Sequence, residues 1–173
     1  MGNNGHPSPN WIRSVLAQYE DRLLRYAQRI VRDEALARDV VQETFLKLCH
    51  QDPAELNGRL AQWLYTVCRN QSVDLVRKES RMSTMLAETP PVAASASPPG
   101  DHVERLDEME RVRTEIEQLT DSQQECLRLK FEHGLSYREI AEITGLSESN
   151  VGFTIHTGLK KLRTRLAEKS GNG

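Results

Sequence analysis

Apolar residues recur at spacings of three and four along most of this chain, which is the period of amphipathic α-helices. In the first half, series of this kind cover residues 11–30, about 33–51 and about 60–81. Short loops containing Pro and Gly separate the second series from the third. The pattern therefore predicts three helices, each with one apolar side, in the first half of the chain.

The predicted second helix has an apolar and a polar face. Its inner face consists of Ala37, Val41, Phe45 and Leu48. Asp39, Glu43 and Lys47 project from the other side. Leu36 and Val40 fall on this polar side as well. Apolar residues within a charged face are typical of a partner surface, but scattered exposed Leu and Val residues are just as common on ordinary surfaces.

The predicted third helix also has two sides. Its inner stripe comprises Leu60, Leu64, Val67, Cys68, Gln71 and Leu75. Its second stripe comprises Thr66, Asn70, Val73, Arg77 and Arg81, with Asp74 and Lys78 alongside. Cations near a helix end also complement the helix dipole, so charge alone fits a solvated surface as well as a binding surface. Trp63 and Tyr65 are able to stack on nucleic-acid bases, but their spacing favours a position in the core.

The most compact pattern lies near the C-terminus, in residues 134–166. Ser136 and Glu139 form a capping box that begins a short helix, and Gly145 supplies the left-handed residue that ends it. Ser147 then caps a second helix, whose apolar stripe comprises Val151, Ile155, Leu159, Leu162 and Leu166. Two helices joined in this way predict a helix-turn-helix, which is typical of DNA-binding proteins and also occurs in bundles that bind nothing.

Between these regions the composition changes. Residues 82–101 are rich in Ala, Ser, Thr and Pro, which predicts a flexible linker. The sequence as a whole predicts an all-α protein with two small helical domains, residues 10–81 and 102–169, joined by this linker.

An acidic helix opens the second predicted domain, at about residues 102–119. Its carboxylates, including Glu115 and Glu117, would repel phosphates, so we expect the helix to lie away from any duplex. Thr120 and Gln123 form a further capping box, which begins the helix that leads into the helix-turn-helix.

Composition limits the partners of the whole chain. Its 173 residues include 23 Lys and Arg against 25 Asp and Glu, a formal net charge of −2. This balance argues against strong nonspecific binding of nucleic acid, which depends on neutralising phosphates. With neither a signal-peptide pattern nor a membrane span in the sequence, we expect a cytoplasmic protein.

The cysteines indicate no metal chemistry. Cys49, Cys68 and Cys126 are far apart and lack the paired spacing of zinc sites. We expect all three to be buried as small apolar residues. His156 has no second His or Cys one helical turn away, so we expect an exposed polar residue rather than a ligand. We predict no metal and no cofactor.

Taken in order, these motifs resemble a known family. A helical unit containing DVVQETFLKL and QWLYTVCRNQSVDLVRK, a variable linker and a terminal helix-turn-helix are similar to small sigma-70 factors of the extracytoplasmic-function type. The resemblance extends over about residues 19–166. Its most specific pieces are residues 39–45, the Trp63–Leu64 pair with the helix that follows, and residues 135–152.

The resemblance implies an RNA polymerase sigma factor, which binds core polymerase and directs promoter-specific initiation without catalytic residues of its own. Core polymerase is expected to contact it through the large-subunit clamp helices and flap, the clamp helices meeting the segment that matches Asp39, Gln42, Glu43 and Lys47. Contacts to the −10 element are implied for Asn70, Asp74, Arg77 and Lys78. Contacts to the −35 element are implied for Glu148, Ser149, Asn150, Phe153, Thr154, Thr157, Lys160 and Lys161.

This chain departs from the family pattern in its recognition helix. Where relatives often carry several Arg and Lys residues, residues 153–157 are Phe, Thr, Ile, His and Thr. We therefore expect a weaker hold on phosphates along this helix. An anti-sigma protein between the two domains is a further partner that the resemblance and the predicted linker permit, although the sequence identifies none.

Two other functions stay open on the residues alone. A stand-alone helix-turn-helix regulator, dimerising through its N-terminal helices, would bind duplex DNA tightly without polymerase. An enzyme has little support, because the sequence has no Gly-rich phosphate loop, no nucleophile signature and no metal spacing.

Overall fold

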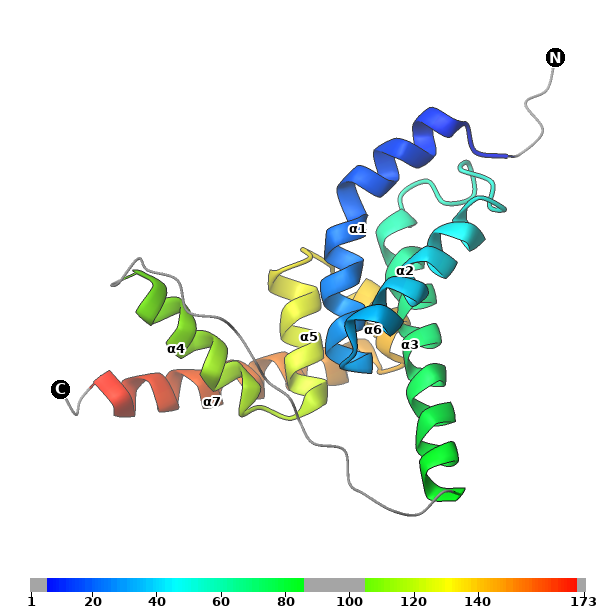
Figure 1. Ribbon diagram of the computed structural model, residues 1–173. Helices are drawn as coiled ribbons and strands as arrows, with labels where there is room; N and C mark the ends of the chain where they lie inside the picture. The colour runs from blue at the N-terminus through cyan, green and yellow to red at the C-terminus, as the bar shows by residue number, and fades with distance from the viewer. Residues whose placement is uncertain (1–5, 86–104, 171–173) are drawn as a thin grey trace. The chain divides into compact units, whose positions relative to one another are not determined.

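The computed structural model describes residues 6–85 and 105–170, and all the regular elements in these ranges are α-helices (Figure 1). They divide into two compact units. The first unit contains α1 (Pro9–Val31), α2 (Glu34–Leu48) and α3 (Leu60–Met85). The second contains α4 (Arg105–Glu117), α5 (Asp121–Phe131), α7 (Glu148–Ser170) and the larger part of α6 (Tyr137–Thr144). The predicted all-α fold with two helical domains is confirmed.

The first unit is a bundle in which each of the three helices packs against the other two. Its fully buried side chains include Leu23 of α1, Leu48 of α2 and Leu64 of α3. Tyr26 of α1 and Tyr65 of α3 meet edge to face, with ring centroids 5.2 Å apart. Burying side chains of this size stabilises the bundle by roughly 1.5–3 kcal/mol each.

The turn between α1 and α2 depends on one unusual residue. Arg32 takes the left-handed conformation, with φ at 57°, and its backbone N–H donates to the carbonyl of Gln28 at 2.8 Å. The side chain of Asp33 then caps α2 by accepting from the N–H of Leu36 at 2.9 Å. The predicted start of the second helix is confirmed, whereas an arginine gives no sequence signal for a left-handed turn.

The buried face of α2 is wider than the predicted stripe. Val40, which we placed on the polar side, is only 3% exposed. The correction has a simple cause: α2 packs against both α1 and α3, so a broader arc of the helix is covered. Leu46 is the apolar residue that remains on the polar side, with 58% of its surface exposed.

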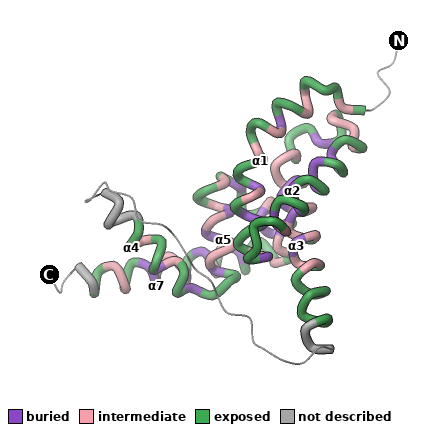
Figure 2. The backbone as a smooth tube through the Cα atoms, viewed as in Figure 1, coloured by how far each residue is buried: buried purple, intermediate pink, exposed green. Residues whose placement is uncertain are grey.

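The set of buried residues in α3 also differs from the predicted inner stripe. The buried side chains are Leu64, Tyr65, Cys68 and Ser72, whereas Leu60, Val67, Gln71 and Leu75 are only half-buried. Beyond them, residues 76–82 are exposed on every side of the helix (Figure 2). Helix α3 also continues past the predicted end at Arg81 as far as Met85. The rest of the predicted linker lies outside the described residues.

The expectation that all three cysteines are buried is wrong for Cys49. This residue is the C-cap of α2, just beyond the part of the helix that the bundle covers, and it is exposed. Cys68 and Cys126 are fully buried. Burial raises the pKa of the Cys68 thiol to about 12, which leaves it neutral at ordinary pH.

In the second unit, the long helix α7 packs against α5 and α4. Gly158 of α7 lies close to α5, since an added Cβ there would lie 3.1 Å from Cδ1 of Leu127. The glycine therefore allows the two helices to approach closely. Val151 and Ile155, from the predicted apolar stripe, are buried on the inner side of α7.

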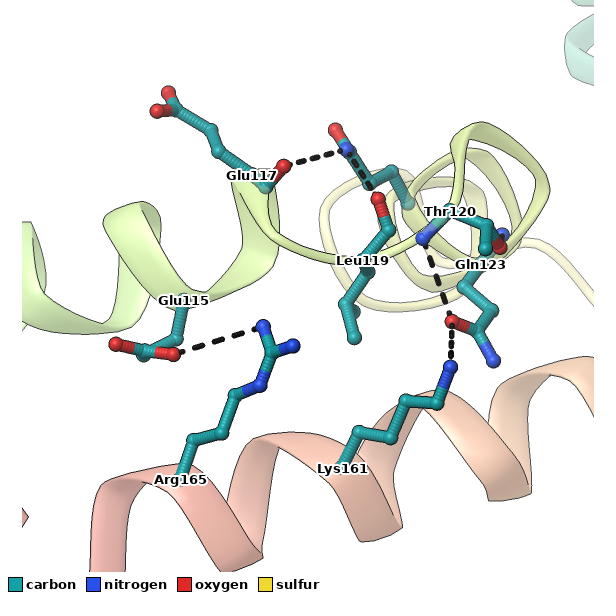
Figure 3. A network of polar contacts seen from close by, with 8 residues as sticks. Glu115, Glu117, Leu119, Thr120, Gln123, Lys161 and Arg165 are labelled. Atoms are coloured by element: carbon teal, nitrogen blue, oxygen red, sulfur yellow. Dashed lines mark hydrogen bonds and ion pairs between the residues drawn. The ribbon is translucent and has the colours of Figure 1, made fainter. Parts of the chain in front are cut away.

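The acidic helix α4 is not solvated throughout. Glu115, one of the carboxylates that we expected to repel phosphates, is only 3% exposed. Its carboxylate lies 3.8 Å from a guanidinium nitrogen of Arg165 on α7 (Figure 3). The opposite charge on α7 offsets the cost of burying this carboxylate.

No helix within residues 6–85 and 105–170 is both long enough and apolar enough to cross a membrane.

Candidate nucleic-acid interface

The helix-turn-helix is formed by α6 and α7, and local hydrogen bonds determine where each helix begins. The N–H of Ser136 donates to the Glu139 carboxylate at 2.8 Å, and the N–H of Glu139 donates to the Ser136 hydroxyl at 3.2 Å. Gly145 ends α6 with φ at 76°. The Ser147 hydroxyl then accepts from the N–H of Asn150 at 3.2 Å, which caps α7. Both predicted caps and the glycine turn are confirmed.

The first turns of α7 face solvent, as a DNA-reading helix requires. Glu148, Ser149 and Asn150 are exposed, and Phe153 is 70% exposed. Glu148 is favourable beside the positive end of the helix dipole, but its charge would repel a phosphate. This end of α7 is therefore better suited to contact base edges than to hold the DNA backbone.

Two of the residues assigned to the −35 element are engaged within the second unit. The side-chain N–H of Gln123 on α5 donates to the Thr157 hydroxyl at 3.1 Å. The ammonium of Lys161 donates to the side-chain carbonyl of Gln123 at 3.4 Å (Figure 3). The side-chain carbonyl of Gln123 also accepts from the backbone N–H of Thr120, which completes the predicted capping box. Gln123 thus joins the start of α5 to the middle of α7.

The structure therefore separates the eight residues assigned to the −35 element into groups. Those directed to solvent are Glu148, Ser149, Asn150, Phe153 and Lys160. Thr154 and Thr157 are half-buried, whereas Lys161 is exposed. Thr157 and Lys161 also form hydrogen bonds with Gln123 of α5.

His156 is exposed, as expected, and we had assigned it no DNA contact. It lies three residues after Phe153 and four before Lys160, so these three side chains share one side of α7. That helical spacing was the sequence signal that could have included it.

The four residues assigned to the −10 element are exposed positions of α3: Asn70 lies between the buried Cys68 and Ser72 in the sequence, and the other three follow Ser72. Asn70 is exposed, as are Asp74, Arg77 and Lys78. The last three line a shallow hollow together with Arg81 and Met82. This part of the surface therefore combines three cations with one carboxylate.

Met82 was not among the residues we predicted, although it is 55% exposed beside these cations. Of the two aromatic residues considered for base stacking, Tyr65 is 1% exposed and belongs to the core, whereas Trp63 is half-buried.

The polar face of α2 carries the residues assigned to polymerase binding. These are Asp39, Gln42, Glu43 and Lys47, and all four are exposed. Leu46 lies among them, four residues after Gln42 and three after Glu43, and we had not included it. An exposed leucine surrounded by charged groups is consistent with a protein-binding face.

In residues 6–85 and 105–170, no group of three or more His, Cys, Asp or Glu side chains is arranged to hold a metal ion.

Comparison with known families agrees with this arrangement. The profile for Sigma-70 region 2 matches residues 15–82, and the profile for Sigma-70, region 4 matches residues 109–162. The chain therefore belongs to the sigma-70 family. It is an RNA polymerase sigma factor of the extracytoplasmic-function (ECF) type, as the following relatives support.

ECF RNA polymerase sigma factor SigK of Mycolicibacterium vanbaalenii is 30% identical over 154 residues, covering 84% of this chain and 76% of SigK. RNA polymerase sigma factor YlaC of Bacillus subtilis is 30% identical over 165 residues, covering 91% of this chain and 95% of YlaC. The stand-alone regulator is therefore not favoured.

Two solved structures share the fold. The sigma factor RpoE, in complex with the anti-sigma factor NepR from Bartonella quintana, gives a TM-score of 0.62 at 21% identity, covering 90% of this chain and 96% of RpoE. CnrH in complex with the cytosolic domain of CnrY gives a TM-score of 0.60 at 23% identity, covering 93% of this chain and 90% of CnrH.

Proposed function

We propose that this sigma factor binds core RNA polymerase through the polar face of α2 and contacts promoter DNA through α3 and α7. The clamp helices of the large polymerase subunit are the proposed partner of the α2 face, and the flap is the proposed partner of the second unit. Residues 10–81 form the proposed core-binding and −10 domain, and residues 102–169 the −35 domain. The chain supplies recognition, whereas the polymerase supplies the catalysis.

The observation that carries this proposal is the exposure of separate polar faces on helices of the two units. On α3, the residues that match the family's −10 segment lie outside the core. On α7, the exposed residues are those of the first turns, the part of a recognition helix that contacts base edges. Few cations on α7 are available to hold the DNA backbone. Such a helix can still recognise a promoter if the polymerase adds DNA contacts of its own.

The cytoplasm is the proposed location, because core polymerase and promoter DNA are found there. We also include an anti-sigma protein among the proposed partners, since the structural relative RpoE was solved in complex with the anti-sigma factor NepR.

Reconstituted transcription with purified core polymerase and a promoter library tests the proposal. We expect initiation from a defined class of promoters. Replacing Asn150 by Ala should weaken transcription from promoters with an intact −35 element by about 5- to 150-fold, since a base contact contributes roughly 1–3 kcal/mol. Binding to core polymerase should stay unchanged, because Asn150 lies on α7.

Asn57→Ala is the matched control, because Asn57 is exposed in the turn region before α3 and outside the proposed faces. No initiation from any promoter would refute the proposal. Tight binding of a dimer to a palindromic duplex without polymerase would instead support the stand-alone regulator. Loss of core binding by Asn150→Ala would mean that the recognition surface is wrongly assigned.

A further inference from the structure

The side of α7 that faces away from the core carries an aromatic ring. Phe153 is 70% exposed, the highest value among the large apolar side chains that the structure describes. Val151 and Ile155, two residues before and after it, are both buried. At about 3.6 residues per turn, a step of two residues rotates by about 200°, so Phe153 lies nearly opposite these buried residues. The ring therefore points into solvent.

The neighbours of Phe153 on this side of α7 are polar. Ser149 lies one turn before it, and His156 and Lys160 lie one and two turns after it. All three are exposed. Because residues three and four apart are neighbours on a helix, these side chains form one line with Phe153. Phe153 is the apolar member of this line.

The ring of Phe153 is unsuited to the DNA backbone. It offers a phosphate neither a positive charge nor a hydrogen-bond donor, and the face of an aromatic ring carries partial negative charge. An exposed ring does gain free energy when other apolar surface covers it. The favourable partner of Phe153 is therefore an apolar group.

Double-stranded DNA presents one such group in the major groove, where a recognition helix lies. Thymine exposes its C5-methyl group there, whereas the other three bases expose hydrogen-bonding atoms, and Phe is one of the side chains that contact this methyl group. Asn150, three residues before Phe153, is also exposed. The two side chains would enter the groove together, so the ring would reach the base edges at the place where Asn150 does.

We propose that Phe153 recognises the C5-methyl group of a thymine in the −35 element. The inference rests on the proposed function, since it requires α7 to lie in the major groove of the promoter. It adds the chemistry of one contact, which is apolar and specific for one base. The promoters of this sigma factor should therefore contain a thymine, on either strand, at the position that Phe153 meets.

The test removes only the methyl group. Holoenzyme is reconstituted from the full chain and core polymerase, and its affinity is measured for a promoter selected from the library. Each thymine of the −35 element, on either strand, is replaced in turn by deoxyuridine, which lacks the methyl group and keeps every hydrogen-bonding atom. At one of these positions we expect the affinity to fall about fourfold, the factor that corresponds to burying one methyl-sized group.

Phe153→Ala should abolish this difference. The variant should bind the thymine promoter at least about fourfold more weakly than the wild type, and it should bind the thymine and deoxyuridine promoters equally. Phe153→Leu keeps an apolar side chain and should retain part of the preference for thymine. Since Phe153 is mostly exposed, both variants should fold, and hydrogen exchange of the α7 amides checks this.

Phe131→Ala is the matched control. Phe131 is 64% exposed and is the last residue of α5, outside the proposed DNA-binding face. This variant should distinguish thymine from deoxyuridine as the wild type does. A second pair of promoters carries cytosine or 5-methylcytosine at the same position. The wild type and Phe131→Ala should prefer the methylated base, whereas Phe153→Ala should bind both promoters equally.

Three results would overturn the proposal while leaving the proposed function intact. The first is a wild-type holoenzyme that binds every deoxyuridine promoter as tightly as the thymine promoter. The second is a methyl preference that persists in Phe153→Ala. The third is weaker binding of Phe153→Ala to core polymerase without DNA and no change in methyl preference, which would assign the ring to a protein contact. If the wild-type holoenzyme binds no promoter selectively, the proposed function itself fails.

Discussion

The two helices proposed to contact DNA, α3 and α7, are built in different ways. In α3 all four proposed contact residues are exposed and none belongs to the core of the bundle, and residues 76–82 are exposed on every side of the helix. In α7, some residues proposed to contact DNA also hold the helix against the rest of the unit, because Thr157 and Lys161 form hydrogen bonds with Gln123 of α5. The surface of α3 should therefore tolerate changes in its own chemistry, whereas that of α7 depends on how α5 holds it.

The two units also differ in how their ends and cores are stabilised. The first unit is held mainly by mutual packing of three long helices, with a turn at Arg32 that lacks a glycine. The second unit uses two complete capping boxes, at Thr120 and Ser136, and a glycine turn at Gly145. We infer that mutations in the core are most damaging in the first unit, and that single polar or glycine positions matter more in the second.

The largest expected effect is loss of packing under α3. Leu64 is fully buried, so Leu64→Ala should lower the free energy of unfolding of the first unit by about 2–5 kcal/mol. Both tryptophans of the chain, Trp11 and Trp63, lie in this unit, so fluorescence during urea unfolding reports it selectively. Leu46→Ala is the matched control. Since Leu46 is 58% exposed, its replacement should change stability by less than about 0.5 kcal/mol. Equal losses of stability in Leu64→Ala and Leu46→Ala would contradict the conclusion that Leu64 is a core residue and Leu46 a surface residue.

A smaller effect is expected at the close approach of α5 and α7. Gly158→Val should destabilise the second unit by about 1–3 kcal/mol, because its side chain would overlap Leu127. At Gly152 the nearest atom to an added Cβ is in Tyr137, at 3.6 Å, an ordinary contact. Gly152→Ala should therefore stabilise α7 by up to about 1 kcal/mol. Hydrogen exchange of amides in α5 and α7 measures both changes, and tolerance of valine at residue 158 would refute the close packing.

A comparable effect is expected from alkaline pH on the first unit. Because burial raises the pKa of Cys68 from 9.0 to about 12, its stabilising effect is complete below pH 9 and is lost between about pH 9 and 12. The loss is at most about 1.4 kcal/mol per pH unit. Tyr65, whose pKa burial also raises, acts in the same direction at higher pH.

Tryptophan fluorescence of urea unfolding from pH 8 to 11 measures this dependence. In Cys68→Ala the decline should be shallower, although the variant starts from lower stability. A decline as steep as that of the wild type would show that Cys68 is not its source.

The smallest effect is expected from the hydrogen bonds between α5 and α7. Gln123→Ala should destabilise the second unit by about 1 kcal/mol and weaken −35 binding a few-fold, since Thr157 and Lys161 lose their partner. Gln124→Ala is the control, because Gln124 bonds the carbonyls of Glu117 and Leu119 rather than α7 (Figure 3). Footprinting of the holoenzyme on the −35 element distinguishes the two variants. Equal losses of binding would argue against a positioning role for Gln123.

Local features were predictable from the sequence. The capping boxes at Thr120 and Ser136, the N-cap at Asp33 and the turn at Gly145 all appear in the structure as expected. Each depends on residues within four positions of one another, so the sequence contains every partner. The order of the motifs also sufficed for the family, and with it for the roles proposed for α2, α3 and α7.

Whether other residues are buried or exposed depended on helices that are distant in the sequence. Val40 is buried because α2 has two packing partners, and Cys49 is exposed because the bundle does not cover the end of α2. For the same reason, helical periodicity alone could not show that Leu46 is the large apolar residue exposed on the face of α2 that we propose to bind polymerase.

The amino-acid sequence by itself determined the helices, their ends and the family, because these follow from interactions between residues that are close along the chain. Only the tertiary structure decided which polar groups are free to bind. Glu115 is buried because Arg165, fifty residues later in the chain, supplies the opposite charge. Thr157 and Lys161 bond to Gln123 because α7 packs against α5. Whether a polar side chain faces DNA or its own protein depends on which helix lies opposite, and a linear pattern does not contain that information.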